Sequence, residues 1–374
     1  MVNHSSIASL LCHIARLTKL GQKAPANKQN ISQPINKEPR PAASCLPAEL
    51  LSEIFMRTLP PFDELFPPSK LRSPMLLTRI CRRWREVAVG TPGLWCRLFG
   101  RFMSSHCRHR KKESFCYDTW LKRSQGLPLS LEVMCFPNPL IGLLQHYTNQ
   151  ISSLRIVCCA ATHDLLLNDL PALQVLTLDG QINYSQSKRS TVARSILNHS
   201  FTLRSLTVTG NEPSFYSADF DPFKNSRWTH LTDVNICVRQ KNVLVALLQQ
   251  APNLSSVKIF IIDIHPEPPL PVKLCKHEKL QLLHIRSFEP FLSLPYMFNA
   301  LSLPNLRNFI ANEGMQPEWP HEEFKAFLAR SKCPLEVLHF GSGMTETPRF
   351  DEQAAEYIAL IPSLKVFPPR KCIR

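Results

Sequence analysis

Apolar residues recur at helical spacing in two segments near the start of the chain. The segment LPAELLSEIF predicts a short helix with five apolar residues on one face, namely Leu46, Leu50, Leu51, Ile54 and Phe55. The segment LLTRICRRWREVAVG predicts a longer helix from residues at the same spacing, namely Leu77, Ile80, Cys81, Trp84 and Ala88. Thr91 and Pro92 then begin a third short helix. Three short helices cannot bury all of this apolar surface, so we expect part of it to face a partner.

A different pattern, L-x-x-L-x-L with other apolar residues substituting, recurs through the rest of the chain. Its nine first positions are Ile151, Leu173, Leu203, Leu231, Leu254, Leu280, Leu306, Leu335 and Leu364. They are 22 to 30 residues apart, about 27 on average, and this period lies in the range of leucine-rich repeats. The last repeat is truncated to Leu364 and Phe367. The Asn/Cys position of the regular repeat is filled only by Asn211 and Cys159.

Each repeat also carries signals for a turn and a helix. Proline lies just before the first position in five repeats, at Pro171, Pro252, Pro304, Pro334 and Pro362, where it ends one element and is tolerated at the start of a strand. Four amphipathic helices are predicted between the strands, over Thr191–His199, Asn242–Gln250, Glu322–Arg330 and Asp351–Leu360. A helix over Tyr117–Ser124 and a strand from Leu127 to Val133 form an atypical first unit. Such units bury their apolar faces by stacking.

The predicted fold class is therefore α/β, with three N-terminal helices followed by an irregular leucine-rich-repeat-like solenoid. A doubly wound parallel sheet also alternates strands and helices, but its strands are buried on both faces and read as continuous apolar runs. Only Val257–Ile262 approaches such a run. In the other strands polar residues stand between the apolar positions, which favours a sheet with one exposed face.

The positive charge of the chain is concentrated in its first third. The whole sequence carries a formal net charge of +15, yet residues 1–125 hold 21 Lys and Arg against 8 Asp and Glu, and residues 126–374 hold 23 against 21. A basic first third is suited to an acidic protein, a nucleic acid or a membrane surface. The thirteen cysteines are odd in number and scattered, which indicates a reducing cytoplasmic or nuclear compartment.

Residues Leu46 to Phe99 resemble an F-box of the type common in fungal proteins. The matching motifs, in order, are Leu46-Pro47, Glu49-Leu50-Leu51, Ile54-Phe55, Cys81-Arg82-Arg83-Trp84-Arg85 and Thr91-Pro92-Gly93-Leu94-Trp95. The resemblance implies docking on the small acidic adaptor of cullin-type (SCF) ubiquitin ligases. It implies adaptor contacts from Leu46, Pro47, Leu50, Leu51, Ile54 and Cys81, and a helical core of Phe55, Trp84 and Trp95. The break from Pro60 to Pro74, with five prolines, is longer than a compact F-box needs.

These patterns divide the chain into four parts. We expect a disordered basic tail over 1–44, an F-box-like helical domain over 45–100, a basic connector over 101–116, and the repeat solenoid over 117–374. No stretch approaches the length of a membrane span.

The sequence lacks the motifs that usually indicate an enzyme or a cofactor site. It has no G-x-x-x-x-G-K-[ST], G-x-G-x-x-G, H-E-x-x-H or C-x-x-C, and we expect neither catalysis nor a cofactor. A metal candidate is the group Cys96, His106, Cys107, His109 and Cys116. Its spacing lacks the close pairs typical of structural zinc and it is surrounded by positive charge, so no metal is expected.

We therefore expect a substrate receptor of an E3 ubiquitin ligase whose solenoid binds a protein substrate. The predicted substrate-facing residues flank the apolar positions of the strands, and they are Asp179, Thr207, Asn235, Lys258, His284, Arg286 and His339. The alternative is a repeat scaffold or nucleic-acid-binding protein that acts independently of ubiquitin ligation. In that case the basic run from Arg97 to Lys112, with its interleaved phenylalanines, drives binding.

Overall fold

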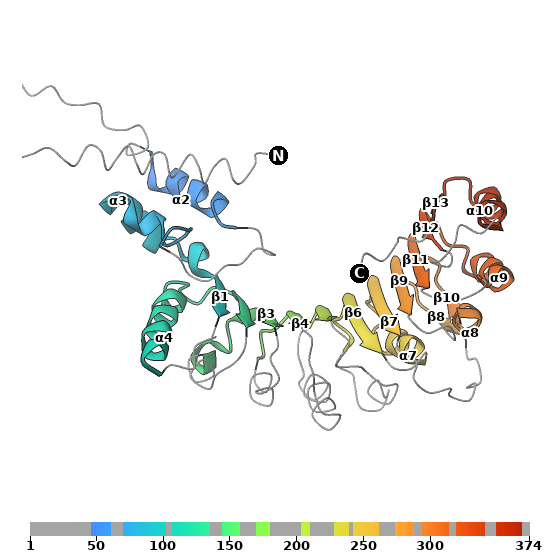
Figure 1. The fold of residues 1–374 in the computed structure, drawn as a ribbon, viewed down its shortest axis with the longest axis horizontal. Helices are drawn as coiled ribbons and strands as arrows, with labels where there is room; N and C mark the ends of the chain where they lie inside the picture. Colours follow the sequence, from blue (N-terminus) through green and yellow to red (C-terminus); the bar gives the residue numbers. More distant parts are fainter. Residues whose placement is uncertain are drawn as a thin grey trace, which may run out of the picture. The chain divides into compact units, whose positions relative to one another are not determined.

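The chain has an α/β fold in which helices and mostly parallel strands follow one another along the sequence (Figure 1). The computed structural model describes residues 46–60, 70–101, 107–134, 144–157, 170–179, 203–209, 228–238, 242–261, 274–287, 294–313, 319–340 and 349–368. The chain divides into two compact units between Val133 and Met134. The expected tail over 1–44 lies outside the described residues, as does most of the proline-rich break.

The first unit begins with short helices and continues into a strand, a longer helix and a second strand. Its elements are α2 (Ala48–Arg57), the 3₁₀ helix η2 (Leu77–Arg79), α3 (Arg82–Val89), the 3₁₀ helix η3 (Pro92–Trp95), β1 (Arg97–Arg101), α4 (Cys107–Lys122) and β2 (Leu129–Met134). Two α-helices and two 3₁₀ helices thus lie in the F-box-like segment, with η2 and α3 where one continuous helix was expected. The second half of the expected connector is helical as well, because α4 begins at Cys107.

Aromatic side chains form the core of this first unit. The ring of Phe55 lies 4.9 Å from that of Trp84, and the indole nitrogen of Trp95 donates a hydrogen bond to the carbonyl of Ala88 at 2.8 Å. Trp120 of α4 packs edge-on against Trp95, with 5.1 Å between ring centroids. Because α4 contributes to the same core, the predicted boundary between residues 116 and 117 falls inside one packed element.

The second unit is built on a sheet in which the strands follow the order of the sequence. Its strands are β3 (Ile151–Val157), β4 (Val175–Asp179), β5 (Ser205–Val208), β6 (Asp233–Val238), β7 (Ser256–Ile261), β9 (Leu282–Ser287), β11 (Asn308–Glu313), β12 (Val337–His339) and β13 (Lys365–Phe367). Every neighbouring pair among these nine is parallel. Two short strands, β8 (Cys275–Lys276) and β10 (Leu301–Ser302), form a separate parallel pair.

The helices of the second unit lie between successive strands. They are the 3₁₀ helix η4 (Gln145–Tyr147), α7 (Asn242–Gln250), α8 (Leu294–Ala300), α9 (His321–Ser331) and α10 (Arg349–Leu360). Helices α7 to α10 all lie on one side of strands β6 to β13 (Figure 1). Three predicted helices correspond to α7, α9 and α10, whereas Thr191–His199 lies outside the described residues. None of the helices in the described part of the chain is long and apolar enough to cross a membrane.

The repeat pattern of the sequence coincides with the buried side of this sheet. The nine first positions are at most 5% exposed, as expected for residues that face the core, and they are Ile151, Leu173, Leu203, Leu231, Leu254, Leu280, Leu306, Leu335 and Leu364. The residue after each of them pairs with its counterpart in the next repeat, as in the 2.8 Å bond from the amide of Ser255 to the carbonyl of Thr232. Burial alternates along the strands. One face of the sheet is therefore partly exposed, which the doubly wound alternative does not predict.

Two asparagine side chains join neighbouring repeats at the turns before the strands. The amide of Asn253 donates to the carbonyl of Thr229, and the amide of Asn305 donates to the carbonyl of Glu278, both at 2.5 Å. These bonds lie at the equivalent place in two repeats, one residue before the first apolar position. The consensus positions at Asn211 and Cys159 lie outside the described residues.

The last strand departs from the predicted pattern. We expected Phe367 to be a buried position of the truncated repeat, but it is 41% exposed, and this prediction is wrong. Strand β13 pairs with β12 so that Val366 lies opposite Leu338 and Phe367 opposite His339. A shift of one residue in register moves a side chain to the other face of a sheet, which places Phe367 on the outward face.

Candidate functional site

Helix α2 of the first unit has one apolar face in the core and a second one at the surface. Leu51 and Phe55 are 1% and 0% exposed, whereas Leu50 and Ile54 are 52% and 36% exposed. Leu50 and Ile54 are four residues apart and are therefore neighbours on the helix surface. We expected Leu51 to contact an adaptor. Its side chain instead packs inside the unit, so it is not available for such a contact. The expected core residues Phe55, Trp84 and Trp95 are all buried.

A hydrogen bond links the starts of helices α2 and α3. The guanidinium of Arg83 donates to the carbonyl of Leu46, directly before the exposed Pro47. Cys81 is half-buried, and its sulfur accepts a hydrogen bond from the amide of Trp84 at 3.5 Å, which caps α3. Five of the six expected adaptor residues are therefore accessible, and we call them the α2 surface: Leu46, Pro47, Leu50, Ile54 and Cys81.

The second candidate site lies on the outward face of the sheet in the second unit. The strand registers place one residue from each of nine successive strands in a single row, which we call the outward row: Arg155, Thr177, Thr207, Asn235, Lys258, His284, Ile310, His339 and Phe367. Five of the seven predicted substrate-facing residues belong to it. The other two, Asp179 and Arg286, stand two residues further along their own strands and so share the same face.

Two of the predicted residues are occupied by contacts within the sheet. The guanidinium of Arg155 donates to the carboxylate of Asp179 at 2.7 Å, and the hydroxyl of Thr209 donates to the same carboxylate at 2.8 Å. Burial acts to raise the pKa of Asp179, but these hydrogen bonds lower it below its usual value. His339 is only 7% exposed, because the ring of Phe367 stacks on it. Both residues hold neighbouring strands together.

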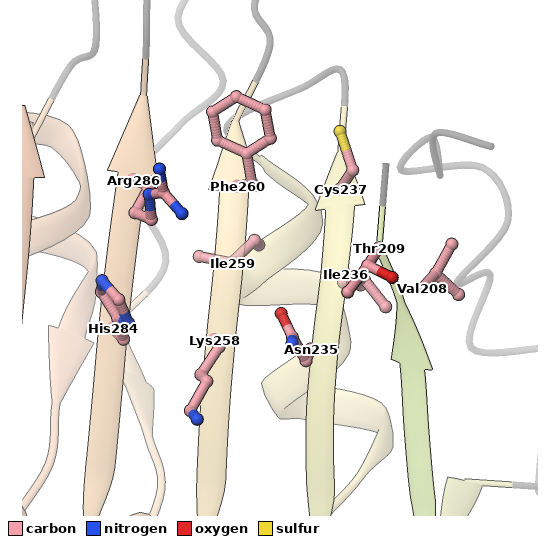
Figure 2. Close-up of a pocket in the computed structure, with 10 residues that line it drawn as sticks. All are labelled: Val208, Thr209, Asn235, Ile236, Cys237, Lys258, Ile259, Phe260, His284 and Arg286. Atoms are coloured by element: carbon pink, nitrogen blue, oxygen red, sulfur yellow. The ribbon is translucent and has the colours of Figure 1, made fainter. Parts of the chain in front are cut away.

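Four of the five remaining predicted residues line an open pocket of about 390 Å³, namely Asn235, Lys258, His284 and Arg286, whereas Thr207 lies outside its lining. Its ten lining residues come from β5, β6, β7, β9 and the turn after β5, and they are Val208, Thr209, Asn235, Ile236, Cys237, Lys258, Ile259, Phe260, His284 and Arg286. Figure 2 shows Lys258, His284 and Arg286 on two adjacent strands. The guanidinium carbon of Arg286 lies 5.8 Å from the ring centroid of Phe260, within the range of a cation–π contact.

Sequence reasoning missed three outward-facing residues of this pocket, namely Thr209, Cys237 and Phe260. Each stands two residues after a member of the outward row and therefore faces the same side. Phe260 follows Lys258 in this way, just as Arg286 follows His284. Applying the two-residue period to every strand identifies all three from the sequence.

The connector brings no metal site together among the residues whose side chains are described. Within the described ranges, no group of three or more His, Cys, Asp or Glu side chains is arranged to hold a metal ion. Of the candidate group, His106 lies outside the described residues, as do the side chains of Cys107 and His109. Burial raises the pKa of the Cys96 thiol, which disfavours the thiolate form that a metal ligand requires.

Comparison with known proteins identified no relative of the chain. No protein-family model matches the chain, and no curated protein matches it at a significant level.

Proposed function

We propose that the chain is the substrate-recognition subunit of a cullin-type SCF E3 ubiquitin ligase. In this proposal the first unit acts as an F-box that docks on the acidic adaptor, and the second unit binds a protein substrate. The observation that carries the proposal is the exposure of Leu50 and Ile54 beside the buried Leu51 and Phe55. An apolar pair at the surface of a small helical unit is typical of a docking site.

The charge around the α2 surface supports the same partner. Helix α3 begins with Arg82 and Arg83 and carries Arg85 one residue beyond Trp84. Arg82 is paired with Glu86 at 2.8 Å, so the helix keeps a positive excess over its single carboxylate. Complementary charge increases the rate and the specificity of association with an acidic protein.

The second unit supports the role of a leucine-rich-repeat-like solenoid. Its strands pair in sequence order, and its described helices α7 to α10 lie on one side of the strands (Figure 1). The strand registers place mostly polar residues in a row on the other side. In repeat proteins of this kind each unit contacts its neighbours, and the stacked strands present an extended binding surface.

The proposed mechanism is proximity rather than chemistry by the chain itself. A receptor that binds both the adaptor and a substrate raises the effective concentration of a substrate lysine near the conjugating enzyme. Catalytic residues and cofactors are not needed for this role.

The test is binding of the purified adaptor to the full chain, compared with the variant L50A/I54A. Burial of a leucine or isoleucine side chain contributes about 1.5–3 kcal/mol, so the variant should bind the adaptor at least about tenfold more weakly. The control is Leu127→Ala, since Leu127 lies in the same unit and is 42% exposed. Equal adaptor binding by L50A/I54A and Leu127→Ala, or no binding by the folded wild type, would contradict the proposal.

The alternative role, a scaffold or nucleic-acid-binding protein, draws on the basic first third of the chain. It predicts that wild-type protein binds a nucleic acid with a steep dependence on salt, and that L50A/I54A binds it equally well. Adaptor binding that is lost in L50A/I54A distinguishes the ligase role from this one.

A further inference from the structure

We propose that the pocket at Lys258 and Arg286 binds the carboxylate side chain of an acidic, extended segment in a protein partner. The inference rests on the proposed function in one respect, because that partner is the substrate of the receptor. Beyond the proposed function, the inference specifies that the bound segment is acidic and names the residues that select it.

The chemistry of the pocket lining favours an anion. Lys258 and Arg286 are positively charged and exposed, and His284 and the amide of Asn235 supply further polar groups. None of the ten described lining residues is acidic. Hydrogen bonds from Lys or Arg to a carboxylate are about twice as strong as those between neutral groups.

The spacing of these groups suits one side-chain carboxylate. Lys258 and His284 are register partners on β7 and β9, so their backbones are about 4.8 Å apart. Arg286 is two residues beyond His284 on the same strand, a rise of about 7 Å. All three side chains reach the same side of the sheet (Figure 2). A carboxylate held between β7 and β9 is therefore within reach of two strands.

Phe260 adds an apolar surface beside this charge. Its ring is half-buried and lies under the guanidinium of Arg286 at 5.8 Å. The stacking limits the positions open to the guanidinium, and the exposed part of the ring can contact the methylene groups of a glutamate. A free inorganic anion offers no group to this ring, which favours a side chain over an ion.

The charge pattern along the row sets where the acidic group binds. At the first strand of the outward row Arg155 is paired with Asp179, so its charge is neutralised. Between Arg155 and Lys258 lie Thr177, Thr207 and Asn235, whose short polar side chains leave room for an extended chain that crosses the strands. Lys258 on β7 and Arg286 on β9 place two cations side by side on the described part of this outward face.

The test uses the full-length protein and fluorescein-labelled dodecapeptides of alternating Glu and Ala, Gln and Ala, or Lys and Ala. We expect the Glu peptide to bind at least about tenfold more tightly than the Gln peptide in fluorescence anisotropy. The variant K258Q/R286Q should lose about tenfold in affinity for the Glu peptide, and K258E/R286E should prefer the Lys peptide to the Glu peptide.

The control variant is K332Q/K365Q. Like K258Q/R286Q it removes two positive charges, but from exposed positions of the second unit outside the pocket. It should bind the Glu peptide as the wild type does, because the basic first third contributes equally to all variants. An equal loss in K332Q/K365Q and K258Q/R286Q would overturn the proposal. So would failure of the Glu peptide to bind the wild type more tightly than the Gln peptide. The adaptor is absent from this assay, so its outcome is separate from that of the adaptor test.

Discussion

The imidazole of His339 lies almost parallel to the ring of Phe367, with 4.8 Å between the ring centroids and 18° between the planes. The contact joins strand β12 to the last strand of the sheet, β13. It covers the outward face at the end of the row, where the histidine ring also contacts the carbonyl of Pro368 at 3.4 Å. The terminal repeat is thus closed by an aromatic residue on the outward side of the sheet.

Removal of this ring should loosen the end of the sheet. We expect Phe367→Ala to lower the free energy of unfolding by about 1 kcal/mol, as for other aromatic pairs. Hydrogen exchange should increase first in β13. Leu360→Ala is the matched control, because Leu360 is 56% exposed near the same end of the chain. Equal stability of the two variants would show that the ring contact contributes nothing.

The packing of Trp120 against Trp95 predicts the extent of the folded N-terminal unit. A fragment over residues 45–133 should unfold cooperatively in urea, whereas a fragment over 45–116 should not, because it lacks Trp120, Leu121 and β2. In the full chain, Trp120→Ala should cost about 3 kcal/mol of stability in this unit. Phe115→Ala, at a residue that is 71% exposed on the same helix, should cost far less. Cooperative unfolding of the shorter fragment would contradict this boundary.

The side-chain bonds of Asn253 and Asn305 should each stabilise the stacking of neighbouring repeats. Asn253→Ala and Asn305→Ala should each reduce the free energy of unfolding by about 1 kcal/mol, the usual net value of one hydrogen bond. Urea denaturation followed by circular dichroism measures the difference. Asn299→Ala, at an exposed position of α8, serves as the comparison. The prediction fails when all three variants are equally stable.

Burial of Cys333 predicts a loss of stability at alkaline pH. Burial raises the pKa of the Cys333 thiol from 9.0 to about 11. Between these two values the unfolded chain releases the thiol proton while the folded chain retains it, so the free energy of unfolding falls as the pH rises. The loss is at most about 2 kcal/mol at pH 11, and below pH 9 the contribution is fully present.

Urea denaturation of the wild type and Cys333→Ala between pH 8 and 11 isolates this effect. The variant should lose stability less steeply across the range, because the titrating thiol is gone. Cys116→Ala removes an exposed thiol and should follow the wild type. Parallel curves for the wild type and Cys333→Ala would refute the assignment.

Part of the fold was predictable because its signals are local. The period of the apolar positions predicted the strands, and amphipathic spacing predicted α7, α9 and α10. Helix α8 was missed because it spans only Leu294–Ala300, and periodicity cannot distinguish a short segment with four buried apolar residues from a buried strand. The helical core of Phe55, Trp84 and Trp95 followed from the resemblance, and all three residues are buried.

The sequence predicted which face of a helix or strand carries each candidate site, but not which residues of that face are accessible. Spacing placed Leu50, Leu51, Ile54 and Phe55 on one helix face, but it could not tell which pair the rest of the unit would cover. Strand alternation placed Asp179 and His339 on the outward face, but it could not show that Arg155 and Phe367 would contact them. These outcomes depend on residues that are distant in the sequence or one position out of register.

The sequence by itself determined which residues face the core in every repeat but the last, because an apolar surface that recurs with this period must be buried. Only the tertiary structure decided which outward residues remain accessible. Strand register brought Lys258 and His284 side by side and set Arg286 beside Phe260, and it closed the end of the row with Phe367. Strand register depends on how neighbouring repeats pack against one another. The sequence of a single repeat therefore does not determine it.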